Sequence, residues 1–290
     1  MFVAMVAKIL YRQMLVQLQN LYNPHEAAII TDRVFEKIAG ITKVDFIKND
    51  ALQVSAIDEE HLRTALYELL QNKPVQYVLS EAWFGHLNLF VNEHVLIPRP
   101  ETEELVQCIV AAQNNAEKIP FSIVDIGTGS GCIPIYLKQK LPAATITAIE
   151  ISEEALKVAN KNALAYQAEI NFLQLNFLDE TTWQPLSKYD IIVCNPPYIP
   201  YKEKEEMDTN VIGFEPHSAL FVADHSPLIF YEKIALFAKT HLAGYGTIYV
   251  EIHEDFAGAT AKVFKEVFKS VVIKKDIFGK NRMISATHFR

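Results

Sequence analysis

Apolar residues in the first 75 positions recur every three or four residues, the spacing that gathers them on one face of a helix. A first helix is predicted over Ile9, Leu10, Met14, Leu15, Leu18 and Leu21. A second begins after the Asn-Pro pair at 23–24, and a third, capped by Asp58, ends near the Lys-Pro pair at 73–74. We therefore expect residues 1–75 to form a small helical domain without a catalytic constellation.

Between about residues 75 and 100 the apolar positions alternate with polar ones, a period typical of a β-hairpin. The apolar set is Trp83, Phe84, Leu87, Leu89, Val91 and Val95, with Gly85, His86, Asn88 and Asn92 among them. The run ends in Ile-Pro-Arg-Pro-Glu-Thr at 97–102, where both prolines fix φ and stiffen the chain. Residues 76–102 are therefore expected to link two domains.

From residue 120 onward, short apolar runs rich in β-branched residues alternate with helical stretches. The runs cover 122–126, 145–150, 170–175, 191–194, 246–252, 271–277 and 283–288, and the main helices cover 153–165, 227–242 and 256–268. Such alternation is typical of an α/β fold with a doubly wound, mostly parallel sheet, which binds ligands at the carboxyl ends of its strands. We expect residues 103–290 to form this domain, with the charged stretch 202–208 as a solvated loop or short helix beside the site.

Composition limits the classes of function. Asp and Glu number 35 against 27 Lys and Arg, which gives a net charge of −8 and argues against a broad basic face for DNA. Cys108, Cys132 and Cys194 form no short-spaced pair, so we interpret them as reduced thiols and expect no metal site. No apolar run approaches the roughly 18 residues that span a membrane. Residues 1–8 indicate the start of a helix rather than a signal peptide, so a cytoplasmic location is expected.

The first strand of the α/β domain runs into a loop with glycines at alternate positions. Its residues are Gly127, Thr128, Gly129, Ser130 and Gly131. Such glycines let the backbone approach a ligand closely, and the spacing, which is not GxGxxG, favours the amino-acid portion of a nucleoside cofactor over a pyrophosphate. Glu150 ends the next strand, where a carboxylate can accept hydrogen bonds from both ribose hydroxyls. A nucleoside cofactor is predicted, against the alternative of a tight turn followed by an exposed glutamate.

The strand at 191–194 delivers Asn195, Pro196, Pro197 and Tyr198 to the carboxyl edge of the sheet. The prolines keep the backbone extended and lack N–H donors, which leaves carbonyls as the available polar groups. The Asn195 side-chain oxygen and the Pro196 carbonyl can accept both N–H bonds of a planar NH2 group, stabilise the positive charge that grows on nitrogen, and direct its lone pair at an electrophilic methyl. Tyr198 can pack against the planar group. The alternative is a proline-rich loop start with no chemistry.

Together these motifs resemble the release-factor glutamine N5-methyltransferases (the HemK/PrmC family) within the class I S-adenosylmethionine-dependent methyltransferases. The matching segments are 74–77, 96–105, 125–133, 195–200, 215–216 with 219–220, and 279–282. Ile-Pro-Arg-Pro-Glu-Thr is the most specific of them, whereas Asn-Pro-Pro-Tyr is shared with N6-adenine DNA methyltransferases. The resemblance implies a class I methyltransferase sheet, mostly parallel with one antiparallel C-terminal strand, a small N-terminal helical domain and a linking β-hairpin.

The resemblance also implies roles for particular residues. The loop 127–131 would line S-adenosylmethionine, Glu150 would bind its ribose, Phe177 would stack near its adenine, and Asn195 would border it. Residues 195–198 would hold the target, the glutamine of the Gly-Gly-Gln loop of a peptide chain release factor. The helices of residues 1–75 would help to recognise that partner. A monomer that binds neither membranes nor DNA directly is expected.

Five positions depart from the family's usual pattern. Glu150 replaces the commoner Asp, Asn176 replaces an acidic residue, Val222-Ala223 replace a Gly-Gly pair, and His253 replaces Gly. Two other hypotheses remain. An N6-adenine or other nucleic-acid amino methyltransferase needs a target-recognition region and basic phosphate contacts. A catalytically silent protein of this fold that only binds a translation partner would not need both the glycine loop and Asn-Pro-Pro-Tyr.

Overall fold

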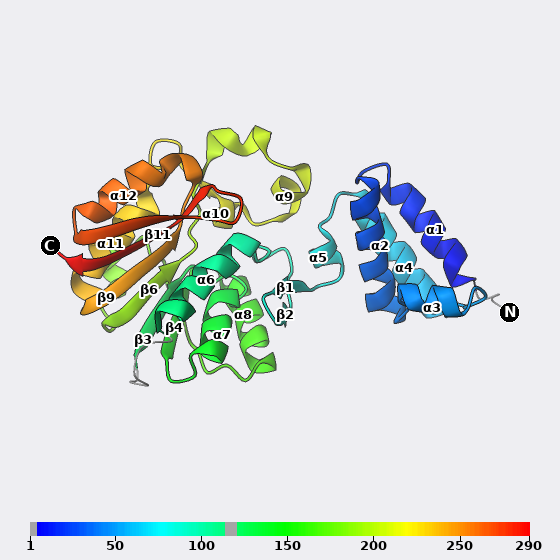
Figure 1. Ribbon diagram of the computed structural model, residues 1–290, viewed down its shortest axis with the longest axis horizontal. Helices are drawn as coiled ribbons and strands as arrows, with labels where there is room; N and C mark the ends of the chain where they lie inside the picture. Colours follow the sequence, from blue (N-terminus) through cyan, green and yellow to red (C-terminus); the bar gives the residue numbers. More distant parts are fainter. Residues whose placement is uncertain (1–4, 114–120) are drawn as a thin grey trace. The chain divides into compact units, whose positions relative to one another are not determined.

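The computed structural model describes residues 5–113 and 121–290, which fold as two compact units (Figure 1). The helical unit contains the described residues up to Ser80 together with Asp208–Phe214. The sheet unit contains the described residues of Glu81–Met207 and Glu215–Arg290. Residues 1–4 of the run expected to start a helix lie outside the described residues, and the first helix begins at Ala7.

The N-terminal helices form as their apolar spacing predicts, and their buried faces share one core. Leu10 and Met14 of the first helix lie in this core with Phe35 of the second and Leu62 of the fourth. The helices of this unit are α1 Ala7–Leu18, α2 Pro24–Ala39, α3 Lys43–Lys48, α4 Ala56–Leu70, α5 Val75–Val78 and, later in the chain, α9 Thr209–Phe214. The prediction of an N-terminal helical region is confirmed.

The capping residue predicted for α4 is wrong. Ser55 is the N-cap, because its hydroxyl accepts the backbone N–H of Asp58 at 3.1 Å. Asp58 is the third residue of the helix, and its carboxylate accepts a hydrogen bond from the Ser55 hydroxyl at 2.7 Å. The two residues thus bond reciprocally, although Asp58 accepts from the Ser55 hydroxyl and not from the backbone N–H that a capping box uses.

The sheet unit opens with the predicted hairpin, in which β1 (Ala82–Phe84) pairs antiparallel with β2 (Leu87–Leu89). Gly85 at its turn has φ +57°, and a Cβ there would lie 2.7 Å from the Tyr136 ring, so both the turn and the close packing require glycine. The proline-rich segment then leads into α6 (Pro100–Gln113), which begins at the second proline.

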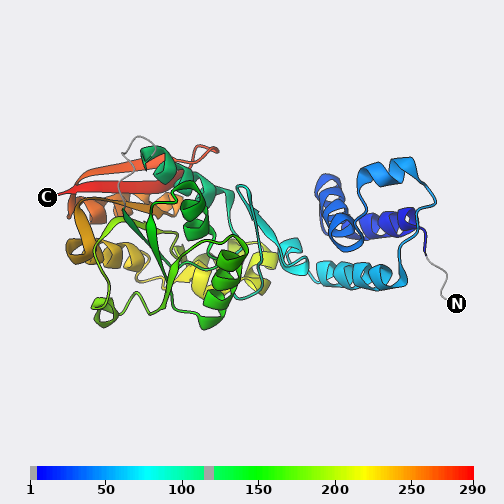
Figure 2. The ribbon, with the colours of Figure 1, turned by 90° about the horizontal axis from the view of Figure 1, so that it is seen from below.

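Seven strands form the central sheet in the order β10-β11-β9-β6-β3-β4-β5. Their bounds are β3 Ser122–Ile126, β4 Thr145–Glu150, β5 Asn171–Gln174, β6 Tyr189–Cys194, β9 Leu242–Glu251, β10 Phe268–Lys275 and β11 Asn281–Phe289. β11 runs antiparallel to both of its neighbours, whereas the pairings among β3, β4, β5, β6 and β9 are parallel. The predicted sheet, mostly parallel with an antiparallel C-terminal strand, is confirmed. Figures 1 and 2 show β10 and β11, in orange and red, at one edge.

Helices cover both faces of this sheet (Figure 1). Alternate residues of β3 point to opposite faces, so Val124 packs in the core under α11 and α12 while Ile123 packs in the core under α6 and α7. The remaining helices and short elements are α7 Cys132–Lys140, α8 Glu153–Ala165, α10 His217–Leu220, α11 Ile229–His241, α12 Ala257–Lys265, β7 Ile199–Pro200, β8 Phe221–Val222 and the 3₁₀ turns Glu180–Trp183, Tyr201–Glu206 and Glu254–Phe256. In the part of the chain that the structure describes, no helix is both long and apolar enough to cross a membrane.

Candidate active site

Four strands end at the same height on one edge of the sheet. Ile126 of β3 is in register with Ile149 of β4 and with Cys194 of β6, which is in register with Val250 of β9. The next residue of each strand is therefore Gly127, Glu150, Asn195 and Glu251. This row brings the predicted glycine loop, ribose carboxylate and amide-binding asparagine together, and it adds one carboxylate that was not predicted to act there.

The glycine loop is held open by its backbone. Gly127, Gly129 and Gly131 have φ angles of +76°, +53° and +80°, which favour glycine. A Cβ at Gly127 or Gly129 would meet nothing within 4 Å, whereas one at Gly131 would lie 3.3 Å from the Ala159 backbone. The first two glycines thus border free space that a ligand can enter, and the third allows α7 and α8 to pack closely.

Buried polar groups beside this loop lack partners. Among the described residues, no hydrogen bond reaches either carboxylate oxygen of Asp125 or the hydroxyls of Thr128 and Ser130. Burial raises the pKa of Asp125 to about 7, and the charge of Glu150 adds to the rise. Unpaired buried polar groups cost free energy, so this cluster fits a charged ligand such as the amino-acid portion of the predicted cofactor. Asp125 was missed, although a carboxylate inside an apolar strand was a usable signal.

Glu150 is occupied by the backbone around it. One oxygen accepts the N–H of Gly129 at 3.0 Å, and the other accepts the N–H groups of Ile151 at 2.8 Å and Ser152 at 3.0 Å. A carboxylate offers about four acceptor positions, so one remains on the oxygen that binds Gly129. Glu150 therefore shapes the glycine loop and keeps a single acceptor position for a further donor.

Phe177 follows β5 and lies inside the apolar core. Its ring is 5% exposed and stacks on Trp183 with centroids 5.3 Å apart, while the edge of Phe237 approaches at 5.4 Å. A ring covered in this way presents little surface to an adenine. Nearby, Asn176 caps a turn by accepting the Leu178 N–H at 3.1 Å, so its side chain has a local structural partner.

Asn195 and Tyr198 are both tied to the end of β9. The Asn195 Nδ2 donates to the Thr102 hydroxyl at 2.9 Å, and this hydroxyl donates to Glu251 Oε2 at 2.7 Å. The Tyr198 hydroxyl donates to Glu251 Oε1 at 3.0 Å. Because the Asn195 amide nitrogen donates to Thr102, its amide oxygen remains available to accept a hydrogen bond, as the sequence hypothesis requires. Pro196 is buried and Pro197 half-buried between these two anchors.

A cavity of about 260 Å³ adjoins Tyr198. The charged stretch predicted to lie beside the site forms a 3₁₀ turn and contributes Glu203 and Glu206 to the cavity wall. His253 lies in the same wall, where its Nε2 is 3.2 Å from Glu203 and its ring meets the Tyr198 ring edge-on at 6.0 Å. The full lining is Tyr198, Ile199, Glu203, Glu206, Met207, His253, Glu254 and Arg282. The stretch 202–208 was expected to be a solvated loop or short helix, and the 3₁₀ turn Tyr201–Glu206 agrees with that expectation.

The departure at Val222-Ala223 is not among the residues that line this cavity. Val222 belongs to β8, which pairs in parallel with β7 through Pro200. This pairing fixes the chain that follows Tyr198. No group of three or more His, Cys, Asp or Glu side chains suited to a metal occurs in the described ranges 5–113 and 121–290.

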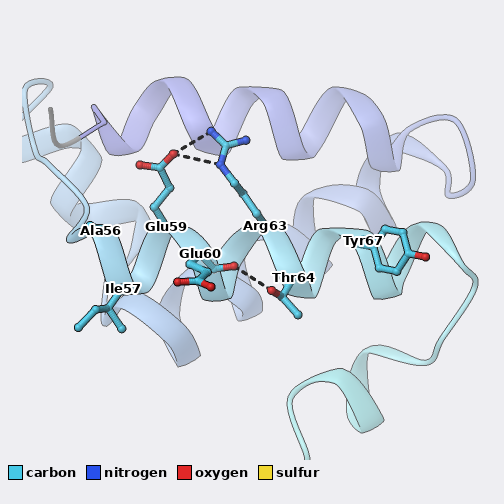
Figure 3. Close-up of a pocket in the computed structure, with 7 residues that line it drawn as sticks. All are labelled: Ala56, Ile57, Glu59, Glu60, Arg63, Thr64 and Tyr67. Atoms are coloured by element: carbon cyan, nitrogen blue, oxygen red, sulfur yellow. Dashed lines mark hydrogen bonds and ion pairs between the residues drawn. The ribbon is translucent and has the colours of Figure 1, made fainter. Parts of the chain in front are cut away.

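A second, wider cavity of about 630 Å³ lies on α4 in the helical unit (Figure 3). Its lining is Ala56, Ile57, Glu59, Glu60, Arg63, Thr64 and Tyr67, all from this helix. Arg63 is held there by two hydrogen bonds to Glu59, at 2.8 and 3.0 Å. The residues predicted for catalysis and cofactor binding do not line it.

Comparison with known proteins gives consistent results. Residues 102–213 match the family described as Methyltransferase small domain. The release factor glutamine methyltransferase of Flavobacterium psychrophilum is 39% identical over 277 residues, which cover 94% of this chain and 96% of that protein. That of Lactococcus lactis subsp. lactis is 48% identical over 219 residues, covering 75% and 78%. Among solved structures, the hMettl16 catalytic domain in complex with MAT2A 3′UTR hairpin 6 covers 83% of this chain with a TM-score of 0.54, and at 13% identity it shows the fold alone.

Proposed function

Because the chain belongs to the release factor glutamine methyltransferase family, we propose that it methylates N5 of the glutamine in the Gly-Gly-Gln loop of a peptide chain release factor. It is an S-adenosylmethionine-dependent methyltransferase. The observation that carries the proposal is the row of strand ends, which sets an open glycine loop beside an asparagine whose amide oxygen is left free to accept.

The residues around the glycine loop fit the methyl donor. S-adenosylmethionine supplies an electrophilic methyl group on a positively charged sulfur. We propose that residues 127–131 hold it, with Thr128 and Ser130 bonding its amino-acid portion and Glu150 accepting from its ribose. Support comes from the free space at Gly127 and Gly129 and from the unpaired hydroxyls. For Phe177 we propose a supporting role in the wall near the adenine, with Trp183 behind it.

The Asn-Pro-Pro-Tyr segment is proposed to bind the target amide. An amide nitrogen is a weak nucleophile because its lone pair is delocalised. The Asn195 oxygen and the Pro196 carbonyl accept its two N–H bonds, which stabilises the positive charge that grows as nitrogen attacks. Pro197 keeps these acceptors rigid and Tyr198 packs against the planar group. Alignment of two bound reactants contributes up to roughly 7–11 kcal/mol, and the product nitrogen releases its extra proton afterwards, so no general base is needed.

We further propose a division of labour along the chain. Residues 1–75 contribute to recognition of the release factor, residues 76–102 link the domains, and residues 103–290 carry the chemistry. The protein is proposed to act as a monomer in the cytoplasm, where release factors work. The acidic balance of 35 to 27 charged residues supports a protein substrate over bare DNA.

One assay tests the activity directly. The protein is incubated with methyl-labelled S-adenosylmethionine and an unmethylated release factor, and the labelled residue is located by mass spectrometry. Label is expected on the Gly-Gly-Gln glutamine and absent from a release factor in which that glutamine is replaced by glutamate. Adenine-containing DNA is the parallel substrate, and label on DNA with none on the release factor would falsify the assignment.

A further inference from the structure

Glu251 is a buried carboxylate, and burying it costs free energy. Its side chain is 1% exposed at the end of β9, and burial raises its pKa to about 7 against the effects of Thr102, Tyr198 and Arg282, with Glu101 adding to the rise. Yet both of its oxygens are bound, one by the Thr102 hydroxyl and one by the Tyr198 hydroxyl. A buried carboxylate that binds two hydroxyl groups indicates that its oxygens serve to orient those hydroxyls.

The first branch decides which way the Asn195 amide faces. Thr102 has one hydroxyl proton and gives it to Glu251, so only its lone pairs are left for Asn195. The amide must then direct its NH2 group at Thr102 and keep its oxygen for another donor. If the Thr102 proton were released, it could bind the Asn195 oxygen, and the amide would turn its NH2 group toward the target. The Asn195 NH2 group and the target NH2 group cannot form a hydrogen bond with each other, so the target would lose this acceptor.

The second branch fixes the other end of the segment. The Tyr198 hydroxyl gives its proton to the second oxygen of Glu251, and the Tyr231 hydroxyl donates to the Glu251 carbonyl at 3.0 Å. Tyr231 comes from α11 and Thr102 from α6, so helices on both faces of the sheet hold the end of β9. One side chain therefore sets both the polarity of Asn195 and the position of the Tyr198 ring.

We propose that Glu251 is a positioning residue for methyl transfer, which keeps Asn195 an acceptor through Thr102 and anchors Tyr198 directly. This inference rests on the proposed function of the Asn-Pro-Pro-Tyr segment. Glu251 touches neither substrate nor methyl donor in it. When the carboxyl is protonated, one of its oxygens becomes a donor. The hydroxyl bound to that oxygen, of Thr102 or of Tyr198, must then accept instead of donate. Arg282 on β11 and Glu101 on α6 are the other charged groups that act on it.

Glu251→Gln is the main test, because it keeps the size of the side chain and replaces one acceptor oxygen by an NH2 donor. Wherever that donor faces, either Thr102 or Tyr198 must reverse. We expect kcat to fall at least tenfold, with the dissociation constant for S-adenosylmethionine within twofold of the parent. In the parent, kcat should rise with pH as the Glu251 carboxyl ionises near pH 7, and this rise should be absent from Glu251→Gln. Glu266→Gln, at an exposed glutamate after α12, is the matched control and should leave both readouts unchanged.

Thr102→Val separates the two branches, since it removes the hydroxyl while keeping the shape. It should lower kcat about as much as Glu251→Gln, and Thr102→Ser should restore most of the rate. A purely structural role predicts a different pattern, in which the two variants lose cofactor affinity and melting temperature together with kcat. If Glu251→Gln fails to fold, the Thr102→Val and Thr102→Ser pair carries the same test.

The outcomes distinguish this inference from the proposed function. Parent-like kcat and pH profile in Glu251→Gln, alongside an inactive Asn195→Ala variant that still binds the cofactor, would overturn the positioning role and leave the function intact. Parent-like kcat in Thr102→Val would equally overturn it. Absence of label on the release factor with the parent enzyme would instead overturn the function itself.

Discussion

Glu215 binds two groups of the proline-rich segment that lies more than a hundred residues earlier in the chain. Its carboxylate accepts the backbone N–H of Ile97 at 3.1 Å and forms an ion pair with Arg99. The Glu215 side chain is buried, whereas Arg99 is about one-third exposed (32%). This contact explains why an Ile-Pro-Arg-Pro segment and a distant Glu-Pro pair belong to one motif set. It holds the chain that leads into α6, and hence Thr102.

Loss of this carboxylate should destabilise the protein. In Glu215→Ala the Ile97 N–H and the Arg99 guanidinium lose their acceptor, and we expect the free energy of unfolding to fall by roughly 3 kcal/mol. Urea denaturation measures it. Glu59→Ala, which removes the partner of the exposed Arg63, is the control and should cost about 0.5 kcal/mol or less. Equal losses in the two variants would show that the Glu215–Arg99 pair stabilises the protein no more than the Glu59–Arg63 pair does.

Asn162 of α8 supports the glycine loop from behind. Its Nδ2 donates to the carbonyls of Ser130 and Phe90, both at 2.9 Å, and its Oδ1 accepts the Phe90 N–H at 2.8 Å. Asn162→Ala leaves these backbone groups unpaired, so we expect a loss of roughly 2–3 kcal/mol of stability and a weaker S-adenosylmethionine affinity. Calorimetric titration gives the affinity. Asn160→Ala loses one bond to the Leu156 carbonyl and should bind the cofactor normally; normal binding by both variants would contradict the role of Asn162.

Asp125 should make stability fall with pH in the unliganded protein. Its folded-state pKa of about 7 lies above the value near 4 in an unfolded chain. Its contribution is fully present below pH 4 and is lost as pH rises to about 7, at up to about 1.4 kcal/mol per pH unit. In Asp125→Asn the free energy of unfolding should therefore drop less steeply between pH 5 and 7, and Glu251 should account for what slope remains. Asp179→Asn is the control, because hydrogen bonds from Thr181 lower the pKa of Asp179, so any effect of this variant falls below about pH 4 and its slope between pH 5 and 7 should match the parent. Unchanged slopes in Asp125→Asn would mean that its carboxyl titrates normally.

Glu150 has two separable tasks, and a cofactor analogue without ribose hydroxyls tells them apart. Glu150→Ala should weaken S-adenosylmethionine about tenfold or more, since a charged hydrogen bond is lost. The parent should prefer S-adenosylmethionine to the analogue, and the variant should show little preference. A preference that survives in Glu150→Ala would mean that this carboxylate only shapes the loop around Gly129. Glu153→Ala, which removes one of the two carboxylates that bind Lys157 on the exposed side of α8, should bind both ligands like the parent.

The sequence was sufficient for elements with strong local signals. The ranges predicted for the first two strands of the sheet and for the helix after Glu150 coincide with Ser122–Ile126, Thr145–Glu150 and Glu153–Ala165. Alternation, β-branched residues and a capping serine are all encoded within a few positions. The wrong cap was predicted for α4 because Ser55 and Asp58 are both residue types that cap helices, and the local sequence does not choose between them.

The partners within the site were beyond the sequence for a physical reason. The Thr102–Glu251 bond joins residues 149 positions apart, and only the packing of α6 on the end of β9 brings them together. A pattern of apolar and polar residues sets which face a side chain takes but not which distant side chain it meets. The available signal was a carboxylate within an apolar run, present at both Asp125 and Glu251. Such a residue is costly to bury unless it has a partner.

The common height of the four strand ends makes the length of each strand a functional quantity. A single residue inserted into β6 would advance Asn195 by about 3.3 Å and turn its side chain to the opposite face of the sheet. The same holds for Glu251 on β9, whereas insertions in the loops that connect the strands at the opposite edge leave the row undisturbed. Natural insertions and deletions should therefore accumulate in the loops at the opposite edge. None should be tolerated between the centre of a strand and its end in the row.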